Sequence, residues 1–187
     1  SSLDFPSGFG RPAGLAVSKG GDLYVVDVLF GKIQLFSPDG EHLQTIESAV
    51  SEDGLFNRPT NVAVDSVGNV YVSDSLNFRV VVQSSAGELI KVIGGIGDGP
   101  GNLARPRGVA LDSKGHLYVV DAAFDNIQIF DLAGQLLLYF GQPGSRGGDF
   151  CLPAGVFIDQ NDRIYVAESC NGRFQLFEYL DVESLQP

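Results

Sequence analysis

Short apolar runs separated by turns dominate the chain and determine its predicted secondary structure. The first four runs cover residues 14–18, 22–27, 32–36 and 43–46. The second run, with Leu, Tyr, Val and Val at residues 23–26, puts apolar side chains on both faces of a strand. Such a strand is buried on both sides, as happens when sheets stack face to face. No stretch has helical periodicity, so the pattern predicts an all-β chain.

The four runs recur at a fixed spacing of 47 residues, without insertion or deletion. Three series of residues show this register: Tyr24, Tyr71, Tyr118 and Tyr165; Pro12, Pro59, Pro106 and Pro153; and Asp27, Asp74, Asp121 and Glu168. A four-stranded antiparallel meander repeated at this period is a propeller blade. The sequence therefore predicts a single β-propeller segment over residues 1–187. Its blades are expected at residues 9–55, 56–102, 103–149 and 150–180, the last without its fourth strand.

The repeat also carries a family resemblance. The stretches RPTNVAVDSVGNVYVSDSLNFRV and RPRGVALDSKGHLYVVDAAFDNIQIF resemble the NHL repeat, and the likeness covers nearly the whole chain. Residues 56–180 are most similar to the C-terminal blades of bacterial extracytoplasmic NHL-repeat proteins. This resemblance implies the propeller fold and a periplasmic or otherwise extracytoplasmic location. It says less about function, because NHL propellers include binding modules, sensor domains and a few lyases.

The number of blades leaves the ring incomplete under this resemblance, because NHL propellers typically close with about six blades. The chain is therefore expected to be the C-terminal part of a longer protein, or to complete its ring as a homo-oligomer. A compact four-bladed ring is the remaining alternative. Open blade faces and a bare strand edge favour association over a lone monomer.

Charge and composition narrow the classes of partner. The formal net charge is −11, whereas nucleic-acid binding needs a basic footprint, so no nucleic-acid partner is expected. The apolar runs are far too short to span a membrane. The two cysteines, Cys151 and Cys170, fall on one side of the fourth blade, where either a disulfide or two free thiols would fit. A disulfide would suit an oxidising compartment.

Candidate recognition residues gather on one face of the predicted ring, which we name the top. It carries the turns between second and third strands and the linkers between blades. We expect the repeated carboxylates Asp27, Asp74, Asp121 and Glu168 to hold these turns by accepting N–H groups. The turns themselves break the repeat, and variation on a regular scaffold is where recognition usually lies. The predicted ligand- or partner-binding residues are Phe30, Asn77, Phe78, Arg107, Phe124 and Asn171.

Two further features favour the top face. Arg107 is a cation where the other copies have Ala13, Thr60 and Ala154. The opposite face, which we name the bottom, is strongly acidic, so an anionic or polar partner meets less repulsion on top. An acidic face that merely confers solubility is the alternative reading of this asymmetry.

Catalytic motifs find little support in the sequence. The only histidines, His42 and His116, are predicted on the bottom face two blades apart, so they should not share a metal. No metal site or cofactor is predicted, although the many carboxylates leave a calcium or magnesium ion in the channel as an open alternative. The interpretation is a non-enzymatic module that binds a protein or small polar ligand. The alternative is a metal-dependent lyase or hydrolase of the six-bladed type, with part of its site outside this chain.

Overall fold

The computed structural model describes residues 8–52 and 54–179, and it forms four antiparallel sheets arranged as propeller blades. Blade one contains β1 (Pro12–Val17), β2 (Leu23–Asp27), β3 (Lys32–Phe36) and β4 (His42–Ile46). Blade two contains β5 (Pro59–Val64), β6 (Val70–Asp74), the 3₁₀ turn η1 (Ser75–Asn77), β7 (Arg79–Gln83) and β8 (Leu89–Gly94). Blade three contains β9 (Pro106–Leu111), β10 (Leu117–Asp121), β11 (Asn126–Phe130) and β12 (Leu136–Phe140). Blade four contains β13 (Pro153–Ile158), β14 (Ile164–Glu168) and β15 (Arg173–Phe177).

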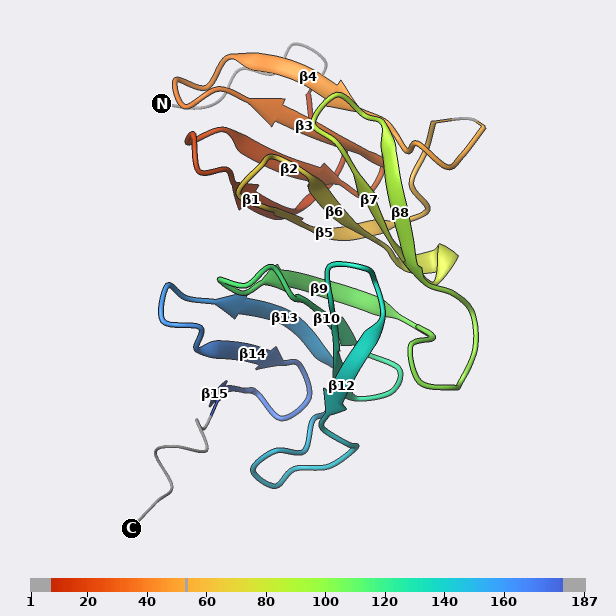
Figure 1. Cartoon of the computed structure of the whole chain (residues 1–187), viewed down its shortest axis with the longest axis vertical. Coiled ribbons are helices and arrows are strands. Elements are labelled where there is room, and N and C mark those ends of the chain that lie inside the picture. Colours follow the sequence, from red (N-terminus) through yellow and green to blue (C-terminus); the bar gives the residue numbers. More distant parts are fainter. Residues whose placement is uncertain (1–7, 53, 180–187) are drawn as a thin grey trace.

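The first strands of successive blades pack against one another, β1 on β5, β5 on β9 and β9 on β13. Figure 1 shows blades one and two in the upper half of the molecule and blades three and four in the lower half, with β5 and β9 side by side between them. The all-β propeller predicted from the sequence is confirmed. The three-residue turn η1 is the single helical element in the described residues.

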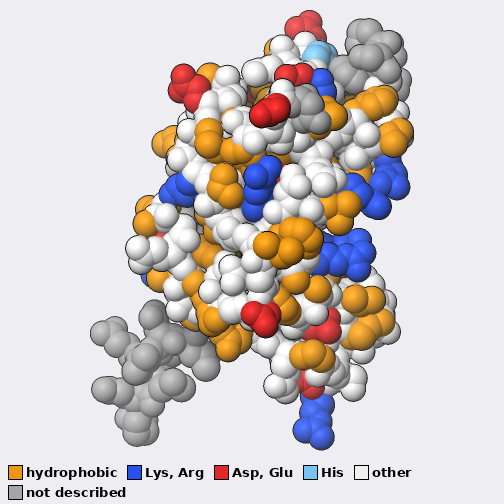
Figure 2. Space-filling model, turned by 90° about the vertical axis from the view of Figure 1, so that its right-hand side faces the viewer, with side chains coloured by type: hydrophobic (Ala, Val, Ile, Leu, Met, Phe, Trp, Pro, Cys, Tyr) orange, Lys and Arg blue, Asp and Glu red, His pale blue; other side chains and the backbone are white. Residues whose placement is uncertain are grey.

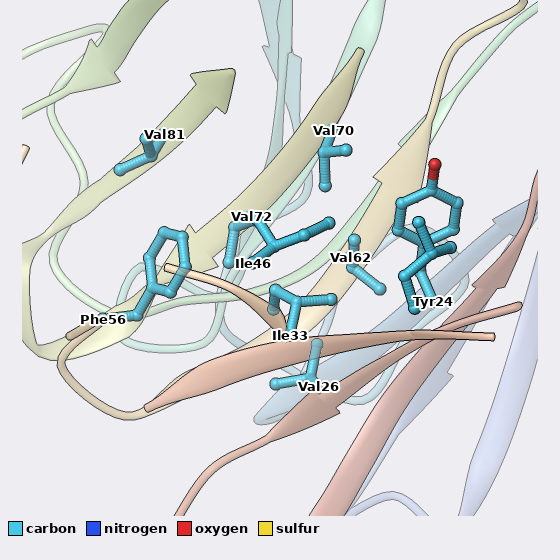
Figure 3. Close-up of a cluster of buried hydrophobic side chains, with 10 residues drawn as sticks. Tyr24, Val26, Ile33, Ile46, Phe56, Val62, Val70, Val72 and Val81 are labelled. Atoms are coloured by element: carbon cyan, nitrogen blue, oxygen red, sulfur yellow. The ribbon is translucent and has the colours of Figure 1, made fainter. Parts of the chain in front are cut away.

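Adjacent blades bury apolar faces against each other, as the double-sided pattern of the second strand predicts. We name the face that packs on the following blade the front, and the face that packs on the preceding blade the back. Figure 3 shows the first of these interfaces, where Tyr24, Val26 and Ile33 of the front of blade one meet Val62 and Val72 of the back of blade two. Equivalent clusters join blades two and three, and blades three and four.

A linker residue closes each interface from the side. Phe56, Leu103 and Phe150 occupy the same position in three consecutive repeats and are fully or almost fully buried. Gly94 shows why the chain beside this residue needs glycine, because a Cβ there would lie 2.5 Å from the side chain of Leu103, and its φ is +82°. The repeat therefore specifies the linkers as well as the strands.

The inner strands approach so closely that two glycines of the first strands leave no room for a Cβ, although blade two carries Asn61 at the same repeat position. A Cβ on Gly14 of β1 would lie 2.6 Å from the Cα atom of Asn61. A Cβ on Gly108 of β9 would lie 2.9 Å from the backbone nitrogen of Val156. The equivalent Gly155 of β13 has nothing within 4 Å of that position, because no described blade follows blade four.

The front of blade four is accordingly uncovered in the described structure. Phe157, Phe174 and Leu176 are 63%, 70% and 47% exposed, whereas Ile127 and Ile129, which correspond to the last two in blade three, are at most 1% exposed. The same front face lines an open apolar hollow of about 460 Å³. Blade four thus presents to solvent a surface of the kind that its sibling blades bury.

Candidate functional site

The top face lies on the right-hand side of Figure 1, where η1 and the linker from β8 to β9 are found. Figure 2 shows this face, and Lys and Arg side chains gather across its middle while Asp and Glu side chains lie mainly above and below. The turns and linkers that build this face are held by the repeated carboxylates at the ends of the second strands.

Asp27 shows how such a carboxylate works. It is fully buried and accepts hydrogen bonds from the backbone N–H groups of Gly10, Arg11, Leu29 and Phe30 at 2.7–3.1 Å. Burial by itself raises the pKa of Asp27, but these four donors outweigh it and hold the pKa below its ordinary value. The side chain therefore ties the incoming linker to the turn of its own blade.

The other three carboxylates repeat this arrangement with different partners. Asp121 accepts the N–H groups of Ala104, Arg105, Ala123 and Phe124. Asp74 accepts the N–H of Asn57 and pairs with the Nε atom of Arg79 at 2.8 Å, and Glu168 accepts the N–H of Cys151 and pairs with Nε of Arg173 at 2.6 Å. These contacts account for a buried acid at this position in every blade.

Two of the predicted binding residues, Asn77 and Asn171, are engaged within their own turns. The Nδ2 atom of Asn77 donates to Asp74 at 2.9 Å. The Nδ2 atom of Asn171 donates to Glu168 at 2.6 Å and to the carbonyl oxygen of Gly144 at 2.9 Å. The structure therefore gives both amides a role in shaping the turns from which neighbouring groups project.

The three predicted aromatic residues lie apart. Phe30 is 45% exposed, whereas Phe78 and Phe124 are half-buried. Phe78 has a left-handed backbone, with φ of 57°, at the end of η1. Within residues 8–52 and 54–179 no ring contact joins any two of these three side chains. Phe124 instead lines a groove on blade three.

Arg107 belongs to a cluster of three cations with Arg58 and Arg105. Burial lowers the pKa of Arg107, and repulsion from Arg105 and Arg58 lowers it further. Among the described residues none of the three guanidinium groups has an acidic partner within ion-pair distance. We name these three side chains the arginine cluster. Unpaired cations held close together attract an anionic group.

A buried hydroxyl network in blade two fixes the backbone of Arg107. The Oγ atom of Ser73 donates to the carbonyl oxygen of Arg107 at 2.7 Å, and Oγ1 of Thr60 donates to the same oxygen at 2.9 Å. Ser75 donates to the carbonyl oxygen of Pro106. These hydroxyls hold the start of β9 against blade two, and with it the base of the Arg107 side chain.

This network was not predicted from the sequence, although the repeat carries a signal for it. Ser73 stands where the sibling blades have Val26, Val120 and Ala167, and it is fully buried. Thr60 stands where two of the siblings have alanine and the third has Arg107 itself. The hydroxyls of blade two and Arg107 of blade three are thus departures from the repeat, and the hydroxyls contact the backbone of Arg107 across the interface.

The cysteines and histidines occupy separate places. Cys151 and Cys170 form a disulfide with Cα atoms 5.5 Å apart, joining the linker into blade four to its second turn. The Nδ1 atom of His116 lies 2.8 Å from a carboxylate oxygen of Asp112. The Nε2 atom of His42 lies 2.9 Å from the side-chain oxygen of Gln34.

Two other kinds of feature are absent from the part of the chain that the structure describes. No group of three or more His, Cys, Asp or Glu side chains there could hold a metal ion. No helical segment in residues 8–52 or 54–179 has the length and apolar character that a bilayer crossing requires.

Comparison with known proteins shows to which class of protein this chain belongs. The fold is that of a β-propeller, and the family described as 6-bladed beta-propeller matches residues 43–142, more than half of the chain. The NHL repeat matches residues 150–177. The chain therefore belongs to the NHL-repeat β-propeller family, which confirms the resemblance read from its sequence. No curated protein matches it.

Solved structures show the same fold at low sequence identity. A streptogramin B lyase is similar with a TM-score of 0.71 at 14% identity, over 96% of this chain and 58% of that one. A virginiamycin B lyase from Staphylococcus aureus gives 0.63 at 15% identity, over 90% and 56%. A protein of unknown function from Bacteroides thetaiotaomicron gives 0.70 at 18% identity, over 88% and 46%. The chain thus spans roughly half of the length of these neighbours.

Proposed function

We propose that this chain is a non-enzymatic binding module whose top face recognises an anionic group on a protein or a small polar ligand. The observation that carries the proposal is the arginine cluster, Arg58, Arg105 and Arg107, which has no acidic partner in the described structure. In a chain with a net charge of −11, three neighbouring unpaired cations create a local field of the opposite sign. An anion with several oxygens can accept from more than one guanidinium at once.

The rigidity of the site supports the same proposal. Because Ser73 and Thr60 both donate to the backbone of Arg107, the start of β9 is held in one position before any ligand arrives. A preorganised site loses less conformational entropy on binding than a mobile loop does. The disulfide of blade four fits an extracytoplasmic location, where oxidising conditions preserve such bonds, and we include that location in the proposal.

A charge-matched pair of variants tests the proposal. The probe is an acetylated tetra-aspartate amide, titrated at low salt into ¹⁵N-labelled protein and followed by amide chemical shifts. The double variant Arg105→Gln and Arg107→Gln is expected to weaken binding about tenfold, since each exposed charge pair contributes up to about 1 kcal/mol. The control, Lys19→Gln with Lys114→Gln, removes the same charge from the bottom face and is expected to leave binding nearly unchanged.

The two variants separate a site from a general effect of charge. Shift changes are expected around the starts of β5 and β9 and to disappear in the arginine variant alone. Equal losses in both variants would show that only net charge matters, and no loss in the arginine variant would place any anion site elsewhere. Either result refutes the proposal.

A further inference from the structure

A groove on blade three is the second place where the top face departs from its own repeat. It has a volume of about 290 Å³ and lies between the linker that precedes the blade and the linker that follows it. Its walls include Asp98, Phe124, Asn126, Tyr139 and Gln142. It shares no residue with the arginine cluster, so it is a separate site.

Asn126 gives the groove an unused hydrogen-bond acceptor. Its Oδ1 atom is buried and has no hydrogen-bond partner, the one side-chain atom in the described residues with this property. A buried polar group without a partner destabilises the folded state, so an isolated case calls for an explanation. Because the Asn126 side chain lines the groove, a small rotation of its amide would turn this atom toward a donor bound there.

Blade four shows what occupies the corresponding place in a sibling blade. The residue equivalent to Asn126 is Arg173, whose guanidinium donates from Nη1 to the carbonyl oxygen of Ser145 and from Nη2 to that of Arg146, both at 2.8 Å. Its Nε atom pairs with Glu168 at 2.6 Å. A planar guanidinium thus lies across the linker of blade four and fills its acceptors.

The linker of blade three has the same conformation as that of blade four. Asn102 N–H donates to Gly99 as Asp149 N–H donates to Arg146, at 3.0 and 3.2 Å. Equivalent glutamines also bind the two linkers in the same way. Nε2 of Gln128 donates to the carbonyl oxygen of Asn102 at 2.7 Å, and Nε2 of Gln175 donates to that of Asp149 at 2.8 Å.

The carbonyl groups of Asp98 and Gly99 therefore stand where those of Ser145 and Arg146 receive Arg173. Asp98 and Gly99 both line the groove. The shorter side chain of Asn126 leaves these acceptors without the guanidinium that covers them in blade four.

We propose that the blade-three groove binds a guanidinium group supplied by another molecule, in the place that Arg173 takes in blade four. The guanidinium would donate to the carbonyl oxygens of Asp98 and Gly99, and to Oδ1 of Asn126 once that amide turns toward the groove. The Asp98 carboxylate adds charge attraction, and the rings of Phe124 and Tyr139 offer cation–π contacts at the groove wall. The source is an arginine side chain of a protein or a small guanidine compound.

A pair of peptides tests the chemistry of the ligand. Acetyl-Gly-Arg-Gly-amide is titrated into the ¹⁵N-labelled chain at concentrations up to about 10 mM, a range that detects even millimolar affinity. Shift changes are expected for residues 98–101, 124–126 and 141–143. The same peptide with citrulline, which is neutral and nearly identical in shape, is expected to bind at least fivefold more weakly. L-Argininamide distinguishes the two sources. If it binds as tightly as the arginine peptide, a small guanidine compound is sufficient as the ligand; if it binds more weakly, the arginine side chain of a protein is the source.

Three substitutions test the location. Asn126→Arg supplies the guanidinium from within the chain, as in blade four, and is expected to weaken peptide binding more than tenfold. Asn161→Arg adds the same charge in a bottom turn and should leave binding unchanged. Asp98→Asn, at an exposed position where substitutions usually change stability little, should weaken binding about threefold. The proposal is overturned by equal binding of the citrulline peptide, by full binding to Asn126→Arg, or by no shift changes in the groove.

Discussion

Gly108 offers the sharpest test of the spacing between inner strands. An alanine Cβ at this position would lie 2.9 Å from the nitrogen of Val156, 3.1 Å from the carbonyl oxygen of Ala154 and 3.1 Å from the Cα atom of Gly155. All three atoms are backbone of β13, so no side chain can rotate away to relieve the contact. Blades three and four would have to move apart by a few tenths of an ångström.

The expected cost follows from two opposing effects. Overpacking of this kind typically destabilises by about 1–3 kcal/mol. Alanine also restricts the unfolded chain, which returns about 0.4–1 kcal/mol because the φ of Gly108 lies outside the left-handed region. We therefore expect Gly108→Ala to destabilise the protein by about 1–2 kcal/mol. The urea midpoint should fall by roughly 0.5 M, for a denaturant slope of about 2–3 kcal/mol/M.

Gly155→Ala is the matched control in the 187-residue chain. It makes the same chemical change at the same repeat position, but its Cβ meets nothing within 4 Å. Its midpoint should stay within about 0.2 M of the parent or rise slightly, as the entropy effect alone predicts. Urea unfolding followed by tyrosine fluorescence and circular dichroism provides the assay, since the chain has no tryptophan. Equal effects of the two substitutions would show that the inner strands are not packed as described.

Three further predictions concern stability. Ser73→Ala removes one of two hydroxyl donors to the carbonyl of Arg107 and should lower stability by about 1 kcal/mol, measured as a shift in urea midpoint. Glu168→Gln should destabilise the protein at pH 7. Burial raises the pKa of Glu168, but its hydrogen-bond donors lower the pKa overall, so the parent loses this stabilisation as the carboxylate is protonated. The difference in stability between variant and parent should therefore shrink below about pH 4.5 in acid titrations. Replacing Cys151 and Cys170 by serine opens a loop of 19 residues and should lower the free energy of unfolding by about 3 kcal/mol, measured by thermal unfolding.

The sequence was sufficient to predict the fold because the repeat is uninterrupted. Tyr24 and its equivalents fix the second strand of each blade, and the apolar pattern on both faces already requires neighbouring sheets. The structure confirms both features. It adds the short turn η1, which the strand pattern could not predict because three residues carry no periodicity.

The candidate sites were harder to predict from the sequence than the fold. Arg107 stands out in the sequence as a departure from its repeat position, whereas its neighbours Arg58 and Arg105 belong to the repeat and give no sign of a cluster. The groove depends on Asn126 being shorter than Arg173, which is visible in an alignment of the blades but has meaning only once the two linkers are known to share a conformation. The hydrogen bonds within each linker are set by tertiary geometry, and side-chain patterns do not report them.

The uncovered front of blade four has a consequence for self-assembly. The front and back of a blade are different surfaces, since Phe157 and Phe174 belong to one and Ile164 and Val166 to the other. Contacts in which the front of one copy packs on the back of another, as blades do within the chain, are therefore heterologous, with a head and a tail. Copies that meet in this way either close into a ring, where the rotation per blade fixes the number of members, or grow without end as a filament.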